Sequence, residues 1–168
     1  MMSERSRLQG VRGFAQLSVV VKSIDETVAF YTDLLGFEAD GDWEGDTAGL
    51  KAMIGIDGIT GRSVVGNIGH LRIEFMDYSI FGKGAVAPPG SLGINNLTFE
   101  VDDIDSIHRQ CVAMALQPGH EPAAISNVRQ FFILDPNGIT LEFVEYNDSR
   151  KGLRSGDLRG QGARWKRA

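Results

Sequence analysis

The sequence predicts an α+β fold made of two tandem βαβββ modules, which form a curved mixed sheet around a concave cup. The first observation is an internal repeat, in which residues 17–25 (LSVVVKSID) recur eighty residues later as residues 97–105 (LTFEVDDID). The second is a repeated closing segment, LRIEFMDY at residues 71–78 and ITLEFVEY at residues 139–146. The third is a helix signal directly after each opening segment. Such a repeat is one supersecondary unit that stacks on its copy.

The repeat also predicts how the chain is organised. We expect an N-terminal tail, a first module, a Gly- and Pro-containing linker, a second module and a basic C-terminal tail, at residues 1–13, 14–80, 81–93, 94–147 and 148–168 respectively. The last segment is either a tail that lies loosely on the surface or an arm anchored by Trp165, which wraps a second subunit or guards a pocket.

Charge and composition exclude several classes of protein. From Ser149 onward the chain has seven basic residues and one acid, a net charge of +6. Since the whole chain has a net charge of −5, residues 1–148 carry −11. An acidic body disfavours nucleic acid as the partner. The single cysteine, Cys111, fits a reducing compartment. Residues 1–13 do not resemble a signal peptide, and the longest apolar run is too short to span a membrane. We therefore expect a cytoplasmic protein that binds a small molecule.

Each module has a helix start signal after its opening strand. Ser23 and Glu26 form an S-x-x-E capping box, and an apolar stripe at helical spacing follows up to a stop signal at Gly36. In the second module Asp103 takes the cap position. Cys111 lies on the apolar stripe of that helix and is expected to be a core residue and not a nucleophile.

The remaining elements follow from alternating apolar residues and turn signals. In the first module we predict strands at residues 14–21, 37–43, 62–66 and 70–78, and a short helix at 47–54. In the second we predict strands at residues 96–101, 129–134 and 139–146, the last two joined by the turn sequence DPNG at 135–138.

Side chains in these strands alternate between two faces of the sheet. One face is apolar and is expected to pack on the helices, whereas the other is polar and would line the cup. By the duplication, four polar residues take related positions on the polar face: Gln16, Glu74, Asn96 and Glu142. Further residues predicted to line the cup, and to favour a partly apolar small molecule, are Val20, Met76, Thr98, Phe131 and Val144.

These segments resemble the vicinal oxygen chelate superfamily, which includes glyoxalase I, methylmalonyl-CoA epimerase, extradiol dioxygenases and bleomycin and fosfomycin resistance proteins. The resemblance covers about residues 14–147. It is carried by VKSID and FYTDLLGF at residues 21–25 and 30–37, by FEVDDI at 99–104 and by DPNGITLE at 135–142. It implies the glyoxalase-like fold and a divalent ion held by the first and last strands of both halves, here Gln16, Glu74, Asn96 and Glu142.

This implied ligand set departs from the family at Asn96, where the family usually has histidine. Amide and carboxylate oxygens suit hard ions, so Mg²⁺, Mn²⁺ or Ca²⁺ is favoured over Zn²⁺ or Ni²⁺, and a protein that works without a metal stays open. The histidines at 70, 108 and 120 do not fall at a ligand position, and we expect them on the surface or in packing. The sequence also lacks the two-histidine, one-carboxylate iron site that an extradiol dioxygenase needs.

Glu74 and Glu142 are the candidate catalytic residues. The simpler alternative is that each glutamate pairs with a neighbouring cation such as Arg72 or Arg129. Two carboxylates in one partly desolvated site separate their pKa values, so that one can act as acid and the other as base. The resemblance implies proton transfer next to a carbonyl group, in an isomerase, an epimerase or a lyase.

A non-catalytic function is the alternative. A binding protein of the bleomycin-resistance type would use the same cup to sequester a ligand, and the loss of histidine at position 96 favours it. The retained pair of glutamates favours catalysis. In either case Gln16 and Asn96 would orient the ligand, or donate hydrogen bonds to an oxyanion. We also expect a homodimer, because each half has exposed strand edges and a one-sided sheet.

Overall fold

The computed structural model describes residues 10, 13–45, 47–78, 93–94, 96–125 and 128–146. The chain divides into two compact units, Met1–Ala85 and Val86–Ala168, and each is described by itself. Most of the predicted N-terminal tail, nearly all of the predicted linker and the whole basic tail with Trp165 lie outside the described residues. None of the described helices is long and apolar enough to cross a lipid bilayer.

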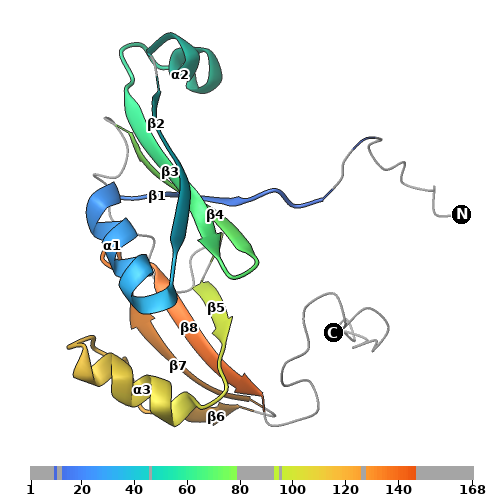
Figure 1. Ribbon diagram of the computed structural model, residues 1–168, viewed down its shortest axis with the longest axis vertical. Coiled ribbons are helices and arrows are strands. Elements are labelled where there is room, and N and C mark those ends of the chain that lie inside the picture. Colours follow the sequence, from blue (N-terminus) through green and yellow to red (C-terminus); the bar gives the residue numbers. More distant parts are fainter. Residues whose placement is uncertain are drawn as a thin grey trace, which may run out of the picture. The chain divides into compact units, whose positions relative to one another are not determined.

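The first unit is a mixed four-stranded sheet in the order β1-β4-β3-β2 (Figure 1). Strand β1 is parallel to β4, and the other neighbours are antiparallel. Helix α1 packs against β3 and β4, whereas α2 is inserted between β2 and β3 and lies beyond the ends of these strands (Figure 1). The elements are β1 (Leu17–Val20), α1 (Ile24–Leu35), β2 (Glu38–Gly45), α2 (Thr47–Ile54), β3 (Gly61–Ile68) and β4 (Leu71–Tyr78).

The second unit repeats this plan without an equivalent of α2. Its sheet has the order β5-β8-β7-β6, again with the first pair parallel and the others antiparallel. Helix α3 packs against β7 and β8. The elements are β5 (Asn96–Glu100), α3 (Ile104–Ala113), β6 (Ala123–Ile125), β7 (Val128–Leu134) and β8 (Thr140–Tyr146). The predicted α+β fold of two βαβββ units is therefore confirmed.

Both predicted helix caps are present. The Ser23 hydroxyl accepts a hydrogen bond from the backbone N–H of Glu26 at 3.3 Å, and α1 ends at Gly36, whose φ of 66° is left-handed. The Asp103 carboxylate accepts from the backbone N–H of Ser106 at 2.9 Å and begins α3. These bonds satisfy N–H groups that have no partner inside the helix, which is why both helices start where the sequence predicts.

The apolar face of each sheet is buried under its helix. In the first unit Tyr31 of α1 contacts Phe75 of β4, with ring centroids 4.8 Å apart. In the second unit Phe131 stacks on Phe143 at 5.2 Å, and the buried ring of His108 meets the edge of Phe131. His108 is thus a packing residue, as expected. Burial of each such aromatic ring contributes about 1.5–3 kcal/mol.

The predicted position of Phe131 on the polar face is wrong. Phe131 lies directly opposite Phe143 and is 0% exposed, so it belongs to the helix-covered face. Its neighbour Phe132 lies opposite Glu142 and takes the place on the polar face. The error is a shift of one residue, because two adjacent phenylalanines fit either parity and only the register of β7 on β8 decides between them.

Candidate functional site

Glu74 is the centre of a polar cluster on the first unit. Its Oε2 accepts hydrogen bonds from Gln16 Nε2 at 2.6 Å and from Ser18 Oγ at 2.7 Å. Its Oε1 accepts from Ser63 Oγ at 2.6 Å. Ser18 reaches this carboxylate because it lies directly opposite Glu74 in the parallel pair of β1 and β4. Both carboxylate oxygens of Glu74 therefore have donors, and the Ser63 hydroxyl is fully buried.

Glu142 is the centre of a similar cluster on the second unit. Its Oε2 accepts from Asn96 Nδ2 at 2.5 Å and from Thr98 Oγ1 at 2.6 Å, and Thr98 lies opposite Glu142 in the parallel pair of β5 and β8. In the part of the chain that the structure describes, no side chain donates to Oε1 of Glu142. Within the described residues, one oxygen of this carboxylate is thus held by two donors and the other by none.

The two clusters match each other residue for residue, apart from one position. Ser63 lies opposite Met76 in the first sheet, and Gln130 lies opposite the corresponding Val144 in the second. Ser63 donates to the Oε1 atom of Glu74, whereas no hydrogen bond joins Gln130 to Glu142 among the described residues. Among the described residues, the two carboxylates of the duplicated sheets therefore differ in their hydrogen bonds, since Glu74 has donors to both oxygens and Glu142 to one. The sequence does not predict the contact of Ser63 with Glu74, because this contact depends on the register of β3 on β4.

The predicted alternative, a salt bridge from Glu74 to Arg72, is wrong. Arg72 lies on the same face as Glu74, two residues earlier in β4, but its guanidinium binds Asp40 at 2.6 and 3.0 Å. Asp40 is the extra residue of a β-bulge, where the register of β2 on β3 shifts. The hydrogen bond from Arg72 lowers the pKa of the Asp40 carboxyl. The bulge therefore holds Arg72 away from Glu74.

The corresponding pairing of Glu142 with Arg129 is also wrong. Arg129 lies opposite Glu145, so it projects from the helix-covered face, and it binds Asp105 of α3 through two bonds of 2.7 Å. This pair lowers the pKa of Asp105 and ties α3 to β7. Neither glutamate is explained as half of a surface ion pair with these arginines.

Tyr78 adds a phenol to the polar face of the first unit, four residues after Glu74 in β4. Burial, and secondarily the negative charge of Glu74, raises the pKa of Tyr78. Its hydroxyl donates to Sδ of Met76 at 3.1 Å, so the phenol stays protonated at neutral pH. Met76 itself lies opposite Val20, which confirms that these two side chains share the face of Glu74.

The donor chemistry of the clusters decides which metals they suit. Each unit supplies one carboxylate and one amide, and the described residues contain no group of three or more His, Cys, Asp or Glu side chains able to hold an ion. The amides of Gln16 and Asn96 turn their nitrogen atoms toward the glutamates. An ion would need their oxygens, so each amide must rotate before it can act as a ligand. Donors of this kind favour weak binding of a hard ion over tight binding of a soft one.

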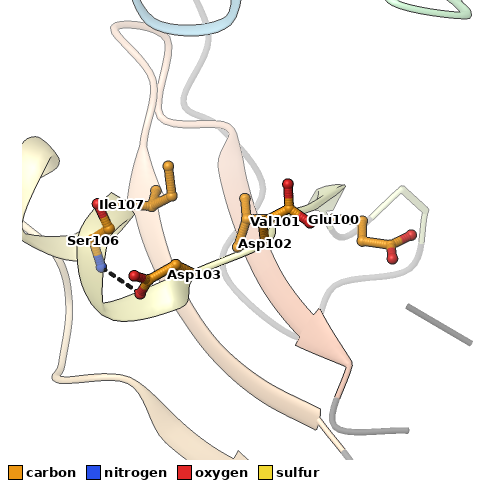
Figure 2. Close-up of a pocket in the computed structure, with 6 residues that line it drawn as sticks. All are labelled: Glu100, Val101, Asp102, Asp103, Ser106 and Ile107. Atoms are coloured by element: carbon orange, nitrogen blue, oxygen red, sulfur yellow. Dashed lines mark hydrogen bonds between the residues drawn. The ribbon is translucent and has the colours of Figure 1, made fainter. Parts of the chain in front are cut away.

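A hollow lies at the start of α3 in the second unit, and neither Glu142 nor its donors Asn96 and Thr98 are among its lining residues. It has a volume of about 540 Å³ and is lined by Glu100, Val101, Asp102, Asp103, Ser106 and Ile107 (Figure 2). Figure 2 shows the Asp103 carboxylate turned to the N–H of Ser106, so this side chain serves the helix cap. Glu145 likewise accepts from the backbone N–H of Ile104 at 3.0 Å. These contacts stabilise the helix start.

Comparisons with known proteins agree with this architecture. The family model of the glyoxalase/bleomycin resistance protein/dioxygenase superfamily matches residues 13–143. A glyoxalase family protein from Bacillus cereus has a similar structure, with a TM-score of 0.70 and 21% identity over 86% of this chain and 99% of that one. A glyoxylase/bleomycin resistance protein/dioxygenase domain from Frankia sp. EAN1pec has a TM-score of 0.65 and 16% identity over the same shares.

A third similar structure contains a metal. The genomically encoded fosfomycin resistance protein FosX from Listeria monocytogenes, in complex with Mn(II) and sulfate, has a TM-score of 0.56 and 16% identity over 86% of this chain and 99% of that one. At these identities the likeness shows the fold. Among curated protein sequences, none matches the chain significantly.

Proposed function

Because the chain belongs to the glyoxalase/bleomycin resistance protein/dioxygenase superfamily, we propose that it is a small-molecule enzyme that transfers a proton next to a carbonyl group, as an isomerase, epimerase or lyase. The observation that carries the proposal is the state of Glu142. Two donors hold Oε2 in place, while Oε1 accepts no hydrogen bond from the described residues. A carboxylate that is oriented through one oxygen and open at the other is suited to act as a general base.

In the proposed step, Oε1 of Glu142 takes a proton from the carbon next to the carbonyl group. The electron pair of the C–H bond moves into the carbonyl group, whose oxygen becomes the enolate oxygen. Glu74 is the second acid–base group, which returns a proton to the substrate. Its serine partners Ser18 and Ser63 can both donate and accept, so they can follow a change in the protonation of Glu74.

The polar neighbours have supporting roles in this proposal. The amides of Gln16 and Asn96 orient the substrate and donate to the enolate oxygen, and Thr98 and Met76 complete the substrate-binding residues. A divalent ion would be held weakly by Gln16, Glu74, Asn96 and Glu142, and when bound it would stabilise negative charge on the substrate oxygen. Mn(II), present in the Listeria FosX structure, is one of the hard ions that such ligands favour over Zn²⁺ or Ni²⁺.

The experiment follows solvent deuterium into carbonyl compounds. Wild-type protein is incubated in D₂O with a panel of enolisable ketones and 2-oxo acids, and loss of the C–H signals is measured by ¹H NMR. Glu142→Gln keeps an acceptor for Asn96 and Thr98 but removes the base. We expect wild-type protein to catalyse exchange with at least one compound, and Glu142→Gln to lose at least about 100-fold in rate. Glu121→Gln, an exposed carboxylate of the same unit, is the matched control and should retain full activity.

Two results would overturn the proposal. Exchange that survives in Glu142→Gln would remove the role of this residue. Saturable binding of a panel compound without catalysed exchange would support the alternative function, a ligand-sequestering protein in which the glutamates only accept hydrogen bonds. Far-UV circular dichroism and thermal unfolding of each variant establish that a loss of exchange is not a loss of fold.

A further inference from the structure

The polar face of the first unit has an apolar end. Tyr78 lies four residues beyond Glu74 on the same face of β4, which places it about 14 Å farther along the strand. Its ring packs with Leu50 of α2 and with Ile59, and all three side chains are buried. Helix α2 thus supplies an apolar contact to the same sheet face that carries the Glu74 cluster. No such helix can lie between the corresponding strands of the second unit, since only residues 126–127 separate β6 from β7.

Two glycines make room for aromatic rings at this end. Gly45 and Gly61 lie directly opposite each other in β2 and β3. A Cβ atom on Gly61 would come within 2.3 Å of the Tyr78 ring, and one on Gly45 within 2.7 Å of the Trp43 ring and 2.8 Å of Leu50. Both rings therefore lie across the sheet over positions that have no side chain. Any larger residue at either glycine would displace them.

A hollow remains beside these rings. It has a volume of about 240 Å³ and is lined by Trp43, Glu44, Gly45, Gly49, Leu50 and Met53. Two of its apolar walls are incompletely covered, since Trp43 is 42% exposed and Met53 74% exposed. A hollow that is lined by two glycines and by large, partly exposed apolar side chains favours binding of an apolar group.

A row of mutually opposite residues relates this hollow to the Glu74 cluster. Across the sheet, Trp43 lies opposite Ser63, Ser63 opposite Met76, and Met76 opposite Val20, which is 39% exposed. Residues opposite each other in register project from the same face. Ser63 is also the donor to Oε1 of Glu74. The hollow and the Glu74 carboxylate therefore lie on the same face of the sheet, and the buried Ser63 lies in the row that relates them.

We propose that the hollow between α2 and β2 binds an uncharged, ring-sized apolar group of the substrate, whose polar end extends along the same sheet face toward the Glu74 cluster. The substrate class is therefore an amphipathic carbonyl compound with an aromatic or alicyclic ring. The volume accommodates one ring and its substituents, and Glu44 at the wall disfavours an anionic group. The carbonyl part of this inference rests on the proposed function, whereas the ring site rests on the hollow alone.

The test compares 4-phenyl-2-butanone with 2-butanone, two ketones with the same enolisable head that differ by the ring. The chain has two tryptophans, so a Trp165→Phe background leaves Trp43 as the only indole fluorophore. We expect 4-phenyl-2-butanone to change the Trp43 emission saturably, and 2-butanone to bind about tenfold or more weakly, because it lacks the buried ring. Saturation-transfer NMR on the phenyl protons provides an independent measure.

Matched substitutions locate the ring. Met53→Ala should weaken binding of 4-phenyl-2-butanone by about three- to tenfold, and Met114→Ala, which shortens an equally flexible exposed methionine of the second unit, should leave it unchanged. Trp43→Phe retains a ring and should bind by NMR more strongly than Trp43→Ala. Equal affinities for the two ketones, no saturable response to 4-phenyl-2-butanone, or equal effects of Met53→Ala and Met114→Ala would overturn the proposal.

A second copy of the chain is the competing occupant of this hollow. Sedimentation velocity of wild-type protein and Met53→Ala distinguishes it, because a dimer that dissociates in Met53→Ala would assign the hollow to self-association and overturn the ring site. The two proposals also fail separately. Ring binding without deuterium exchange would reject the proton-transfer function alone, and exchange without ring discrimination would reject the ring site alone.

Discussion

Ser63 donates a hydrogen bond to Oε1 of Glu74 across 2.6 Å, from a fully buried position in β3. The duplicated sheet has Gln130 at the corresponding place, and among the described residues it makes no such bond to Glu142. The repeat has thus kept both carboxylates, but among the described residues only Glu74 has donors to both of its oxygens. This difference separates a carboxylate held in place from one that is open to a substrate.

Removal of the Ser63 hydroxyl should destabilise the protein. We expect Ser63→Ala to lower the free energy of unfolding by about 1–2 kcal/mol, because a hydrogen bond to a charged acceptor is lost and the half-buried Glu74 regains only part of its solvation. Urea denaturation followed by circular dichroism measures the change. Gln130→Ala is the control and should cost less than about 0.5 kcal/mol. Equal effects of the two substitutions would show that the hydrogen bond from Ser63 to Glu74 does not contribute measurably to the free energy of unfolding.

The ion pair of Asp40 and Arg72 should protect the Glu74 cluster. In Asp40→Asn the guanidinium of Arg72 loses its partner and can pair with Glu74, which lies two residues away on the same face. We expect deuterium exchange to fall by about tenfold, since general acid–base groups contribute about 10²–10⁴ and pairing removes part of this. Adding Arg72→Met to Asp40→Asn should restore the rate. A double variant as slow as Asp40→Asn would refute this explanation.

Acid sensitivity should follow from the arginine-paired aspartates. Hydrogen bonds from arginine lower the pKa values of Asp40, Asp42 and Asp105 in the folded protein. A lowered folded-state pKa stabilises the protein above the pKa of the unfolded chain, and this stability is lost as pH falls from about 4 through the folded-state pKa.

The pair of Asp105 and Arg129 allows a direct test. We expect the urea midpoint of wild-type protein to fall between about pH 5 and pH 2, and the fall to be smaller in Asp105→Asn. Asp33→Asn changes an exposed carboxylate of α1 that has no ion pair among the described residues, and it should keep the wild-type pH profile. An unchanged slope in Asp105→Asn would contradict the predicted linkage.

Local signals in the sequence predicted most of the elements, because each of these has a local cause, whereas β6 (Ala123–Ile125) was given no predicted range. The Ser23 and Asp103 caps define the helix starts, and the short helix α2 was predicted at its observed bounds, Thr47–Ile54. Strand parity placed the amide and carboxylate of each unit on one face, since a period of two needs no knowledge of the partner strand.

Features that depend on the pairing of strands could not be predicted in this way. Phe131 and Phe132 exchange faces with a shift of one residue, and only the register on β8 decides which of them lies beside Glu142. Asp40 reaches Arg72 through a bulge that the sequence does not mark. Ser63 likewise contacts Glu74 only because β3 and β4 are paired in this register. These three contacts set the chemistry of the polar faces.

The oligomeric state remains a prediction from the sequence. We expect a homodimer, because each unit has a one-sided sheet whose order leaves a strand at either end, β1 and β2 in the first sheet and β5 and β6 in the second. Light scattering coupled to size-exclusion chromatography should give twice the monomer mass at micromolar concentrations. A monomer mass throughout that range would contradict the prediction.

The metal preference of the clusters can be changed at one position. Asn96 replaces the histidine that is usual in the family, and an amide is a weak ligand for soft ions. We expect Asn96→His to bind Zn²⁺ or Ni²⁺ about tenfold or more tightly than wild-type protein in calorimetric titrations. Gln130→His, on the same polar face but outside the predicted ligand set, is the control and should gain no affinity.

Stoichiometric zinc or nickel in wild-type protein, by elemental analysis after dialysis against a mild chelator, would refute the predicted preference for hard ions. No gain in Asn96→His would show that Gln16, Glu74, Asn96 and Glu142 do not act as one ligand set.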